Sequence, residues 1–223
     1  MPLTLAIDCA LRRINLGASC GDDGGEILGE LSLDVGTRQS ELLPEVVRFF
    51  LGSMGYSPGD ISLMAVTTGP GYYTGIRVGL AYSTALAYSL GVKIVPAPTL
   101  AAMAHGVLET LEASGAPTPV APLIPAGRGS IYAAVYSGPS CSAKAILEPS
   151  HIGVQDFINF LDSMNCAAPL IVGNDISSVA ERLAGCRAVS PIRGMGEAMV
   201  KISRFTEPVD PAAVLATYLR SPC

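Results

Sequence analysis

The start of the chain alternates short apolar segments with turn residues. Segments rich in apolar and β-branched residues lie at Leu3–Cys9, Ile14–Cys20 and Glu26–Leu33. This pattern predicts three strands that follow one another in a meander. A helical pattern comes next, with Ser40 as its expected N-cap and Pro44 in its first turn. The apolar residues at helical spacing are Leu42, Leu43, Val46, Val47, Phe50 and Leu51.

The following elements alternate between strand and helix. The pattern predicts a strand at Ile61–Thr68, a helix at Thr74–Leu90, a short strand at Val92–Val95 and a helix that opens at Pro98-Thr99. Small residues and prolines then interrupt the pattern in Ser114–Pro119. That segment is the expected linker between two lobes, residues 1–114 and residues 115–223.

After the linker the order of elements repeats. The predicted elements are strands near Val120–Ile124, Ser130–Tyr136 and Lys144–Leu147, a helix at Val154–Met164, a strand at Pro169–Val172, a helix at Asp175–Leu183, a strand at Arg187–Val189 and a helix near Glu197–Phe205. An antiparallel meander continued by right-handed crossovers buries its strands between helices. Two such units predict an α/β protein with a duplicated ribonuclease-H-like (actin-like ATPase) fold, in which each lobe has a mixed five-stranded sheet flanked by helices. In that fold Asp8–Asn15 and Ala126–Ser130 would form the turns that meet a nucleotide.

Composition narrows the class of protein. Apolar residues make up 49% of the chain, enough for a sizeable core. The net charge is −5 and the arginines are scattered, so the chain alone is expected to bind nucleic acid poorly. The start of the chain has no basic leader, and no apolar segment approaches the roughly 18 residues that span a bilayer. We therefore expect a cytoplasmic protein that does not contact membranes.

The six cysteines contain no Cys-x-x-Cys pair, and most lie in or beside apolar segments. They are expected to be buried free thiols in a reducing compartment. The cysteines are Cys9, Cys20, Cys141, Cys166, Cys186 and Cys223.

The segment Gly69–Leu80 carries most of the functional information. It reads Gly-Pro-Gly-Tyr-Tyr-Thr-Gly-Ile-Arg-Val-Gly-Leu and links a predicted strand to a predicted helix. Glycines allow close backbone approach, and a helix N-terminus offers unpaired N–H groups, so the segment could hold an anion. It has neither the Gly-Lys-Ser/Thr ending of a Walker A loop nor the Gly-x-Gly-x-x-Gly spacing of a dinucleotide-binding loop.

Small residues recur every four positions along the helix that this segment opens. They are Gly75, Gly79, Ser83, Ala87 and Gly91. The spacing places them on one face, as a ridge that lets another backbone come close. Each glycine inside a helix costs roughly 1 kcal/mol relative to alanine, so packing must offset that cost. The spacing leaves two alternatives open: packing on the chain's own sheet or neighbouring helix, and helix-to-helix docking with another subunit.

These segments resemble the bacterial TsaB (YeaZ) family. Gly69–Leu80 is similar to that family's hallmark Gly-Pro-Gly-Ser-Phe-Thr-Gly-Ile-Arg-Ile-Gly-Leu. Three other segments agree in order: Leu3–Asp8 with the opening strand, Ser40–Pro44 with the Leu-Leu-Pro helix start, and Tyr218–Arg220 with the C-terminal Tyr-Leu-Arg. The resemblance is strong over residues 3–105 and weaker beyond them.

The resemblance implies an accessory subunit that helps make N6-threonylcarbamoyladenosine at position 37 of tRNAs reading codons that begin with A. Members of the family form homodimers when alone and bind a TsaD-type catalytic subunit, which a TsaE-type ATPase joins. ATP and a metal are implied for the partner complex, through which alone tRNA is reached. No cofactor, metal or catalytic residue is expected on the isolated chain.

The expected partner interface lies on the two predicted helices Leu42–Leu51 and Gly75–Gly91. It comprises Leu42, Leu43, Val46, Phe50, Tyr72, Tyr73, Gly75, Arg77, Gly79, Ser83 and Ala87. One of the two tyrosines is expected to pack over the helix start, and the role of the other is open. Arg77 lies in the first helical turn, where the dipole disfavours a cation, so a specific partner is expected for it.

Asp8, Gly69 and Gly71 are the expected remnant of a nucleotide turn. Where the family has Thr-Ser after the aspartate, this chain has Cys9-Ala10, and where it has Asp-Ala-Arg in the second lobe, this chain has Pro125-Ala126-Gly127. The lost hydroxyls and the lost acid disfavour tight ATP binding. We therefore interpret Gly69–Leu80 as a hinge and docking helix inherited from a nucleotide-binding fold.

Enzymes of the same superfamily are the alternative. A small-molecule kinase would need acids in both phosphate turns. An M22-type metallopeptidase would need a His-x-x-x-His pair where this chain has Thr99–Met103, and His105 with Glu109 is too few ligands for a metal. The Gly-x-Ser-x-Gly pattern at Gly17–Gly21 precedes a predicted strand where a nucleophile elbow requires a helix.

Overall fold

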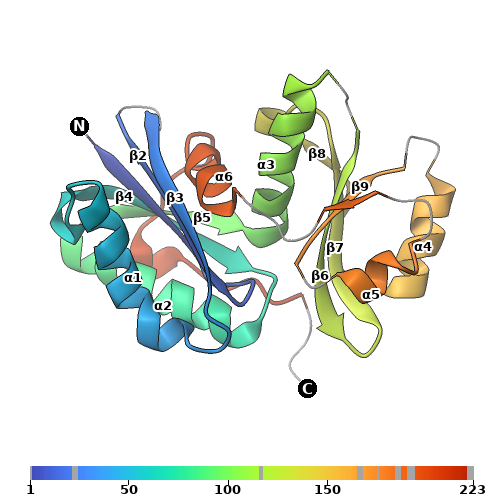
Figure 1. Cartoon of the computed structure of the whole chain (residues 1–223), viewed down its shortest axis with the longest axis horizontal. Helices are drawn as coiled ribbons and strands as arrows, with labels where there is room; N and C mark the ends of the chain where they lie inside the picture. Colours follow the sequence, from blue (N-terminus) through green and yellow to red (C-terminus); the bar gives the residue numbers. More distant parts are fainter. Residues whose placement is uncertain are drawn as a thin grey trace. The chain divides into compact units, whose positions relative to one another are not determined.

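The computed structural model describes residues 2–21, 25–115, 118–164, 168–174, 176–183, 187–189 and 194–219. The chain divides into two compact units, residues 1–99 with 194–217 and residues 100–193 with 218–223. Each unit contains one five-stranded mixed sheet with helices beside it (Figure 1). The predicted fold class is confirmed. None of the described helices combines the length and hydropathy needed to cross a bilayer.

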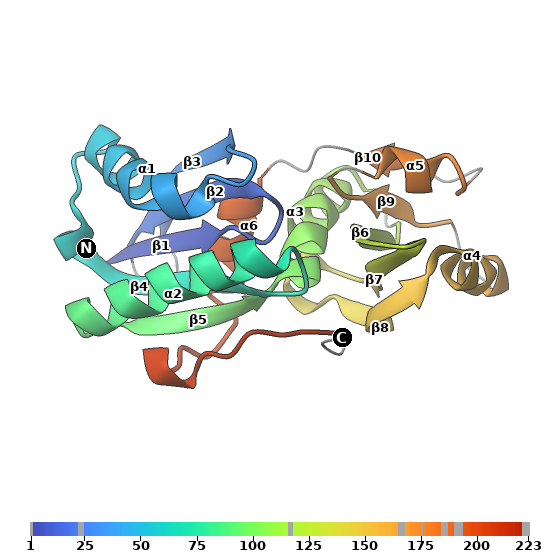
Figure 2. The same cartoon turned by 90° about the horizontal axis from the view of Figure 1, so that it is seen from below.

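The sheet of the first unit has the strand order β3-β2-β1-β4-β5. The first three strands form the predicted antiparallel meander, and β1, β4 and β5 pair in parallel. Helices α1 and α2 cover one face of the sheet and α6 lies on the other (Figure 2). The elements are β1 (Leu3–Asp8), β2 (Arg13–Cys20), β3 (Glu26–Asp34), α1 (Gln39–Ser53), β4 (Ile61–Gly69), α2 (Tyr73–Leu90), β5 (Lys93–Pro98) and α6 (Met195–Ile202), with 3-10 turns at Pro58–Asp60 and Pro211–Ala213.

Helix α1 begins two residues earlier than the sequence predicts. Its N-cap residue is Arg38, which makes no side-chain capping hydrogen bond, so the predicted Ser40 cap is wrong. The reason lies in Gln39, whose buried side-chain amide donates a hydrogen bond of 2.8 Å to the carbonyl oxygen of Cys9. That bond fixes Gln39 against the end of β1 as the first residue of the helix.

Two glycines let α6 lie directly on β2. A Cβ atom at Gly17 would overlap the backbone of Gly196, and one at Gly196 would overlap the backbone next to Gly17. The carboxylate of Glu30 on β3 accepts hydrogen bonds of 3.0 Å from the backbone N–H groups of Gly194 and Glu197, and so caps the helix. The sequence places this helix in the second lobe, whereas these contacts join it to the first unit.

The sheet of the second unit has the order β10-β9-β6-β7-β8, in which β6, β7 and β8 are antiparallel and β9 and β10 are parallel to β6. Helix α3 clusters largely with this unit, although the sequence assigns it to the first lobe. Its Glu112 carboxylate accepts a hydrogen bond of 3.2 Å from the backbone N–H of Ser140. The elements are α3 (Thr99–Ala113), β6 (Val120–Gly127), β7 (Ser130–Ser137), β8 (Lys144–Gly153), α4 (Val154–Ser163), β9 (Leu170–Val172), α5 (Ser177–Ala180) and β10 (Ala188–Val189), with a 3-10 turn at Ser140–Ser142.

Candidate functional site

The carboxyl end of β1 holds a buried acid. The side chain of Asp8 is fully buried, and Oδ1 accepts hydrogen bonds from the backbone N–H of Ala10 at 2.9 Å and the hydroxyl of Thr67 at 2.7 Å. Oδ2 accepts one from the side-chain amide of Asn15 at 2.7 Å. The chain's own donors therefore occupy both carboxyl oxygens, which leaves Asp8 enclosed within the unit.

The glycine-rich segment packs against the turn that follows β1. The Cβ position of Gly71 lies 2.6 Å from the carbonyl oxygen of Ala10, and a Cβ atom at Gly75 would overlap the carbonyl oxygen of Cys9. The backbone N–H of Tyr72 donates a hydrogen bond of 2.9 Å to the same Ala10 carbonyl. These glycines thus permit close approach of the chain's own backbone, in the place where the sequence suggested an anion.

Gly69 is covered by the segment that contains Thr217. It has a φ of 109°, which favours glycine, and its Cβ position lies 2.5 Å from the carbonyl oxygen of Thr217. The backbone N–H of Thr217 donates a hydrogen bond of 2.7 Å to Thr68. The chain's own atoms therefore fill the space around the three residues of the expected remnant turn, Asp8, Gly69 and Gly71.

Burial raises the pKa of Asp8 above its ordinary value of 3.8, because desolvation disfavours the charged form, while the hydrogen bonds from Asn15, Thr67 and Ala10 oppose that rise. Between the unfolded and the raised folded pKa, the native state binds more protons than the unfolded state. The contribution of Asp8 to the free energy of unfolding is therefore greatest below the unfolded pKa. It falls as the pH rises from the unfolded pKa through the folded pKa.

Asp8→Asn should abolish this pH dependence. We expect the wild-type protein to lose stability relative to Asp8→Asn as the pH rises from about 4, because only the wild-type carboxyl must then be ionised in a desolvated place. Urea unfolding of both proteins across this pH range measures the difference between their free energies of unfolding. The other acidic residues are the same in both proteins, so their contributions cancel in that difference. A difference that stays constant with pH would contradict the assignment.

The small-residue ridge of α2 faces the chain's own sheet. Gly75, Gly79, Ser83 and Ala87 are all buried, and the Cβ position of Gly79 lies 3.4 Å from the side chain of Cys9. Gly91 ends the helix in a left-handed conformation with a φ of 67°. The structure selects the first alternative for the ridge. As partner contacts these four residues are a wrong prediction, because the sheet beneath α2 already occupies the close approach that they permit.

The apolar residues of α1 divide between core and surface. Leu43 and Phe50 are buried in the core, so they too offer nothing to a partner, whereas Leu42 and Val46 are partly exposed. Two aromatic residues that the sequence analysis did not single out are exposed on these helices: Phe49 at 70% and Tyr88 at 79%. Their signal was available, since each is a large apolar residue outside the buried stripe of its helix.

The two tyrosines before α2 have different surroundings. Tyr72 is half-buried, and the guanidinium of Arg12 lies 4.0 Å from the centre of its ring. Tyr73 is 59% exposed, and its hydroxyl accepts a hydrogen bond of 2.9 Å from Arg77. One tyrosine thus packs at the helix start, and Arg77 has the specific partner that its position predicts.

The second unit has its own turn after a first strand, between β6 and β7. Arg128 at its tip has a φ of 52°, and the hydroxyl of Ser130 donates a hydrogen bond of 2.7 Å to the carbonyl of Gly127. Ser130 also lies 2.9 Å from Nε2 of His151. Because the serine proton goes to a backbone carbonyl, His151 donates in this pair and does not activate the serine as a nucleophile.

Among the described residues, no group of three or more His, Cys, Asp or Glu is arranged to hold a metal ion. His105 is buried on α3, one turn before Glu109. Of the cysteines within the described part of the chain, Cys9 is buried as predicted, Cys20 is intermediate and Cys141 is exposed, contrary to the prediction. Cys166, Cys186 and Cys223 lie outside the described residues.

A sequence profile of the family described as "TsaD: tRNA N6-adenosine threonylcarbamoyltransferase" matches residues 34–187. The chain belongs to this family. The solved structure "YeaZ from Pseudomonas aeruginosa" superposes on 98% of the chain and 100% of its own length, with a TM-score of 0.78 and 18% identity. This TsaD-family chain thus has the actin-like fold that the resemblance to TsaB (YeaZ) implied.

Two relatives align with parts of this TsaD-family chain. "tRNA threonylcarbamoyladenosine biosynthesis protein TsaB" of Bacillus subtilis is 29% identical over 133 residues, which are 59% of this chain and 54% of that protein. The tRNA N6-adenosine threonylcarbamoyltransferase of Pyrobaculum neutrophilum is 36% identical over 91 residues, 40% of this chain and 25% of that protein. The chain spans about half the length of the first relative and a quarter of the second. The resemblance to the TsaB family is confirmed.

Proposed function

We propose that this TsaD-family chain is a non-catalytic assembly subunit of the complex that installs N6-threonylcarbamoyl on adenosine 37 of tRNAs reading codons that begin with A. It acts by binding and activating a TsaD-type catalytic subunit. The names of the B. subtilis and P. neutrophilum relatives support this pathway. We infer that the chain works in the cytoplasm.

The observation that carries the proposal is a set of exposed and partly exposed residues on the outer sides of α1 and α2. We call it the α1–α2 face and define it by Leu42, Val46, Phe49, Ala81, Ala85 and Tyr88. Within each helix the three residues are spaced i, i+4 and i+7, so they form one stripe. The two helices pack beside one another on the same face of the sheet (Figure 2). Aromatic residues are enriched among the few interface residues that contribute most of the binding energy.

The filled turn around Asp8 supports a division of labour with the partner. A nucleotide phosphate needs open backbone N–H groups and an accessible acid or metal, and this turn presents neither, because its oxygens and glycines contact the chain itself. We infer that ATP and the metal belong to the TsaD-type subunit and that a TsaE-type ATPase joins the pair. The chain reaches tRNA through that complex, and forms a homodimer when alone.

The experiment that tests this function is depletion followed by measurement of threonylcarbamoyladenosine in bulk tRNA. We expect the modification to fall strongly on depletion and to return with the wild-type chain. Phe49→Asp with Tyr88→Asp should fail to restore it, whereas Phe205→Asp, an equally exposed phenylalanine away from the face, should restore it. An unchanged level of the modified nucleoside after depletion would refute the proposal.

A further inference from the structure

Two arginines lie over tyrosine rings at the start of α2. The guanidinium of Arg12 lies 4.0 Å from the centre of the Tyr72 ring. The guanidinium of Arg77 lies 5.2 Å from the centre of the Tyr73 ring. Tyr72 is the N-cap of α2 and Tyr73 is its first residue, and we call these four residues the arginine end. A ring that holds a guanidinium by its flat face leaves N–H groups at the edge of that group available to an acceptor such as a carboxylate.

The arginine end continues the α1–α2 face. Arg77 lies one turn before Ala81, and Tyr73 lies one turn before Arg77. All three residues are exposed, so they extend the stripe of α2 that runs to Tyr88. Arg77 is also the one charged residue of this helix. The face therefore has an aromatic end at Tyr88 and a cationic end at the N-terminus of α2.

Neither arginine of this end has a carboxylate partner among the described residues. Asp34, at the end of β3, forms an ion pair of 3.2 Å with Arg13. Glu41, in the first turn of α1, forms one of 3.0 Å with Arg38. The first turn of α2 contains no acid and adds the positive end of its helix dipole. A local excess of positive charge thus remains on a chain whose net charge is −5, and it is complementary to an acidic surface.

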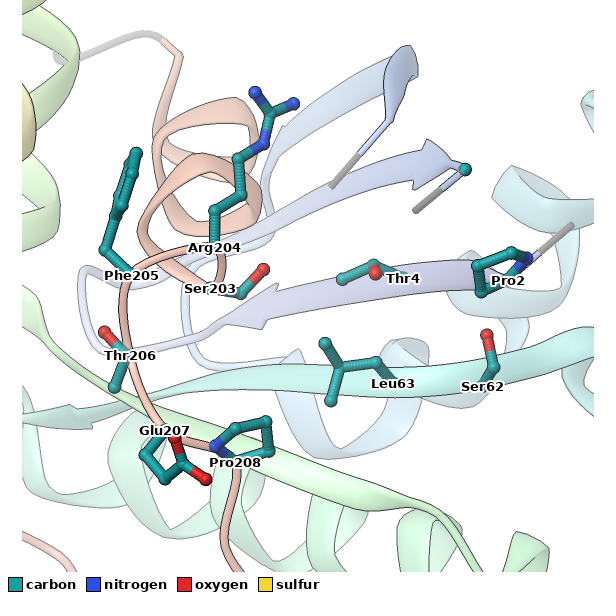
Figure 3. A pocket seen from close by; sticks show the side chains of 11 residues that line it. Pro2, Thr4, Ser62, Leu63, Ser203, Arg204, Phe205, Thr206, Glu207 and Pro208 are labelled. Carbon is teal, nitrogen blue, oxygen red and sulfur yellow. The ribbon is translucent and has the colours of Figure 1, made fainter. Parts of the chain in front are cut away.

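The other side of the same sheet has an arginine that the chain itself already binds. Figure 3 shows Arg204 and Phe205, which follow α6, beside a hollow of about 440 Å³. The guanidinium of Arg204 donates a hydrogen bond of 2.9 Å to the carbonyl of Gly25, and Glu207 brings a negative charge to the same hollow. The excess of positive charge therefore belongs to the side of the sheet that carries α1 and α2.

A protein segment fits the arginine end better than RNA does. Nucleic-acid binding relies on several cations that neutralise successive phosphates, whereas this end offers the guanidinium groups of Arg12 and Arg77 on a chain of negative net charge. An apolar stripe with charged residues at its rim is the composition of a protein–protein interface. The position of the arginines at the end of the α1–α2 face therefore favours the same protein partner for both.

A second copy of the chain fits less well than a different protein. On α1 and α2 the exposed charged residues outside the described ion pairs are Glu45, Arg48 and Arg77. Two copies that faced each other through these helices would bring together more positive than negative charge, which is unfavourable. A partner with an acidic surface removes that imbalance.

We infer that the arginine end binds an acidic segment of the TsaD-type subunit, which places one carboxylate against each guanidinium of Arg12 and Arg77. This inference rests on the proposed function and specifies which part of the partner meets which end of the α1–α2 face. It gives the docking a direction, because the aromatic end attracts apolar side chains and the arginine end attracts carboxylates.

Calorimetric titration of the full-length chain with the TsaD-type protein of the same organism, at low and at high salt, tests the contact. Arg12→Gln and Arg77→Gln should each weaken binding about tenfold, and the affinity of each variant should depend less on salt than that of the wild type. Arg128→Gln is the matched control and should bind like the wild type. Arg128 is exposed with a φ of 52° in the turn after the first strand of the second unit, as Arg12 is with a φ of 59° in the first.

Arg77→Glu gives a second test that does not depend on a loss of stability. A carboxylate in the first turn of α2 suits the helix dipole, so the variant should stay folded. Against an acidic partner it should bind more than tenfold more weakly than the wild type, and its affinity should rise with salt because salt screens the new repulsion. An affinity that falls with salt as in the wild type would overturn the inference.

The remaining outcomes separate this inference from the proposed function. Absence of binding between the wild-type chain and the TsaD-type protein would refute both. Binding that keeps its affinity and its salt dependence in Arg12→Gln and Arg77→Gln would refute the arginine end alone. Variants that bind the partner normally but lose self-association in sedimentation, or lose binding to tRNA, would assign the arginine end to a second copy or to RNA and overturn the inference.

Discussion

Gly75→Ala is expected to destabilise the protein by about 3 kcal/mol, whereas Gly79→Ala, one turn further along the same helix, is expected to be neutral or stabilising. The difference lies in what each new methyl group meets. At Gly75 it overlaps the backbone carbonyl of Cys9, which accepts a hydrogen bond of 2.8 Å from the side-chain amide of Gln39, and that amide nitrogen itself lies 3.2 Å from the new methyl position. At Gly79 it meets only the Cys9 side chain, at 3.4 Å.

Neither neighbour of Gly75 can move cheaply. Cys9 follows the buried end of β1, and a shift of the N-terminus of α2 would break the hydrogen bond between Tyr72 and Ala10. The gain in helix propensity from alanine, roughly 1 kcal/mol, offsets only part of the overlap. At Gly79 the same gain is opposed by an ordinary van der Waals contact.

Urea unfolding followed by circular dichroism measures both variants, and each serves as the control for the other. Loss of stability at Gly75 alone shows that the ridge serves the chain's own packing. Equal loss at both positions would contradict the contacts at Gly79, and no loss at Gly75 would contradict the overlap with Cys9.

The ridge shows how far the sequence could predict this fold. A four-residue spacing of small side chains establishes that a backbone comes close on that face, but it does not say which backbone. The answer depends on Cys9 and Ala10, which lie more than 60 positions earlier and reach α2 only after β1 pairs with β4. The placement of α6 has the same origin, because the contact between Gly17 and Gly196 joins two ends of the chain.

The elements themselves were predictable because their patterns are local. The meander, the two five-stranded sheets and the start of α3 at Thr99 follow from apolar periodicity and turn residues. The burial and hydrogen bonding of Asp8 were not predictable. The sequence shows only an aspartate at the end of a strand, and it does not distinguish oxygens that face solvent from oxygens that bond to Asn15 and Thr67. The exposed positions of Phe49 and Tyr88 could have been predicted, because each residue lies outside the buried stripe of its helix.

The second large effect concerns the α1–α2 face. Phe49→Asp with Tyr88→Asp should weaken binding to the TsaD-type protein of the same organism by more than a hundredfold. Buried aromatic anchors each contribute about 2 kcal/mol or more at interface centres, and a desolvated carboxylate adds its own penalty. Both side chains are mostly exposed in the isolated chain, at 70% and 79%, so the substitutions should leave its stability within about 0.5 kcal/mol.

Co-purification and calorimetric titration of the two proteins measure this loss. Phe205→Asp is the matched control, because it introduces the same charge at a phenylalanine that is 65% exposed and lies after α6, on the other side of the sheet. Tight binding that survives in the double variant would show that the face is not the docking surface, even if the tRNA modification depends on the chain. Loss of binding in the double variant with retention in Phe205→Asp would place the partner on α1 and α2, since both variants keep the fold and differ only in which surface carries the charge.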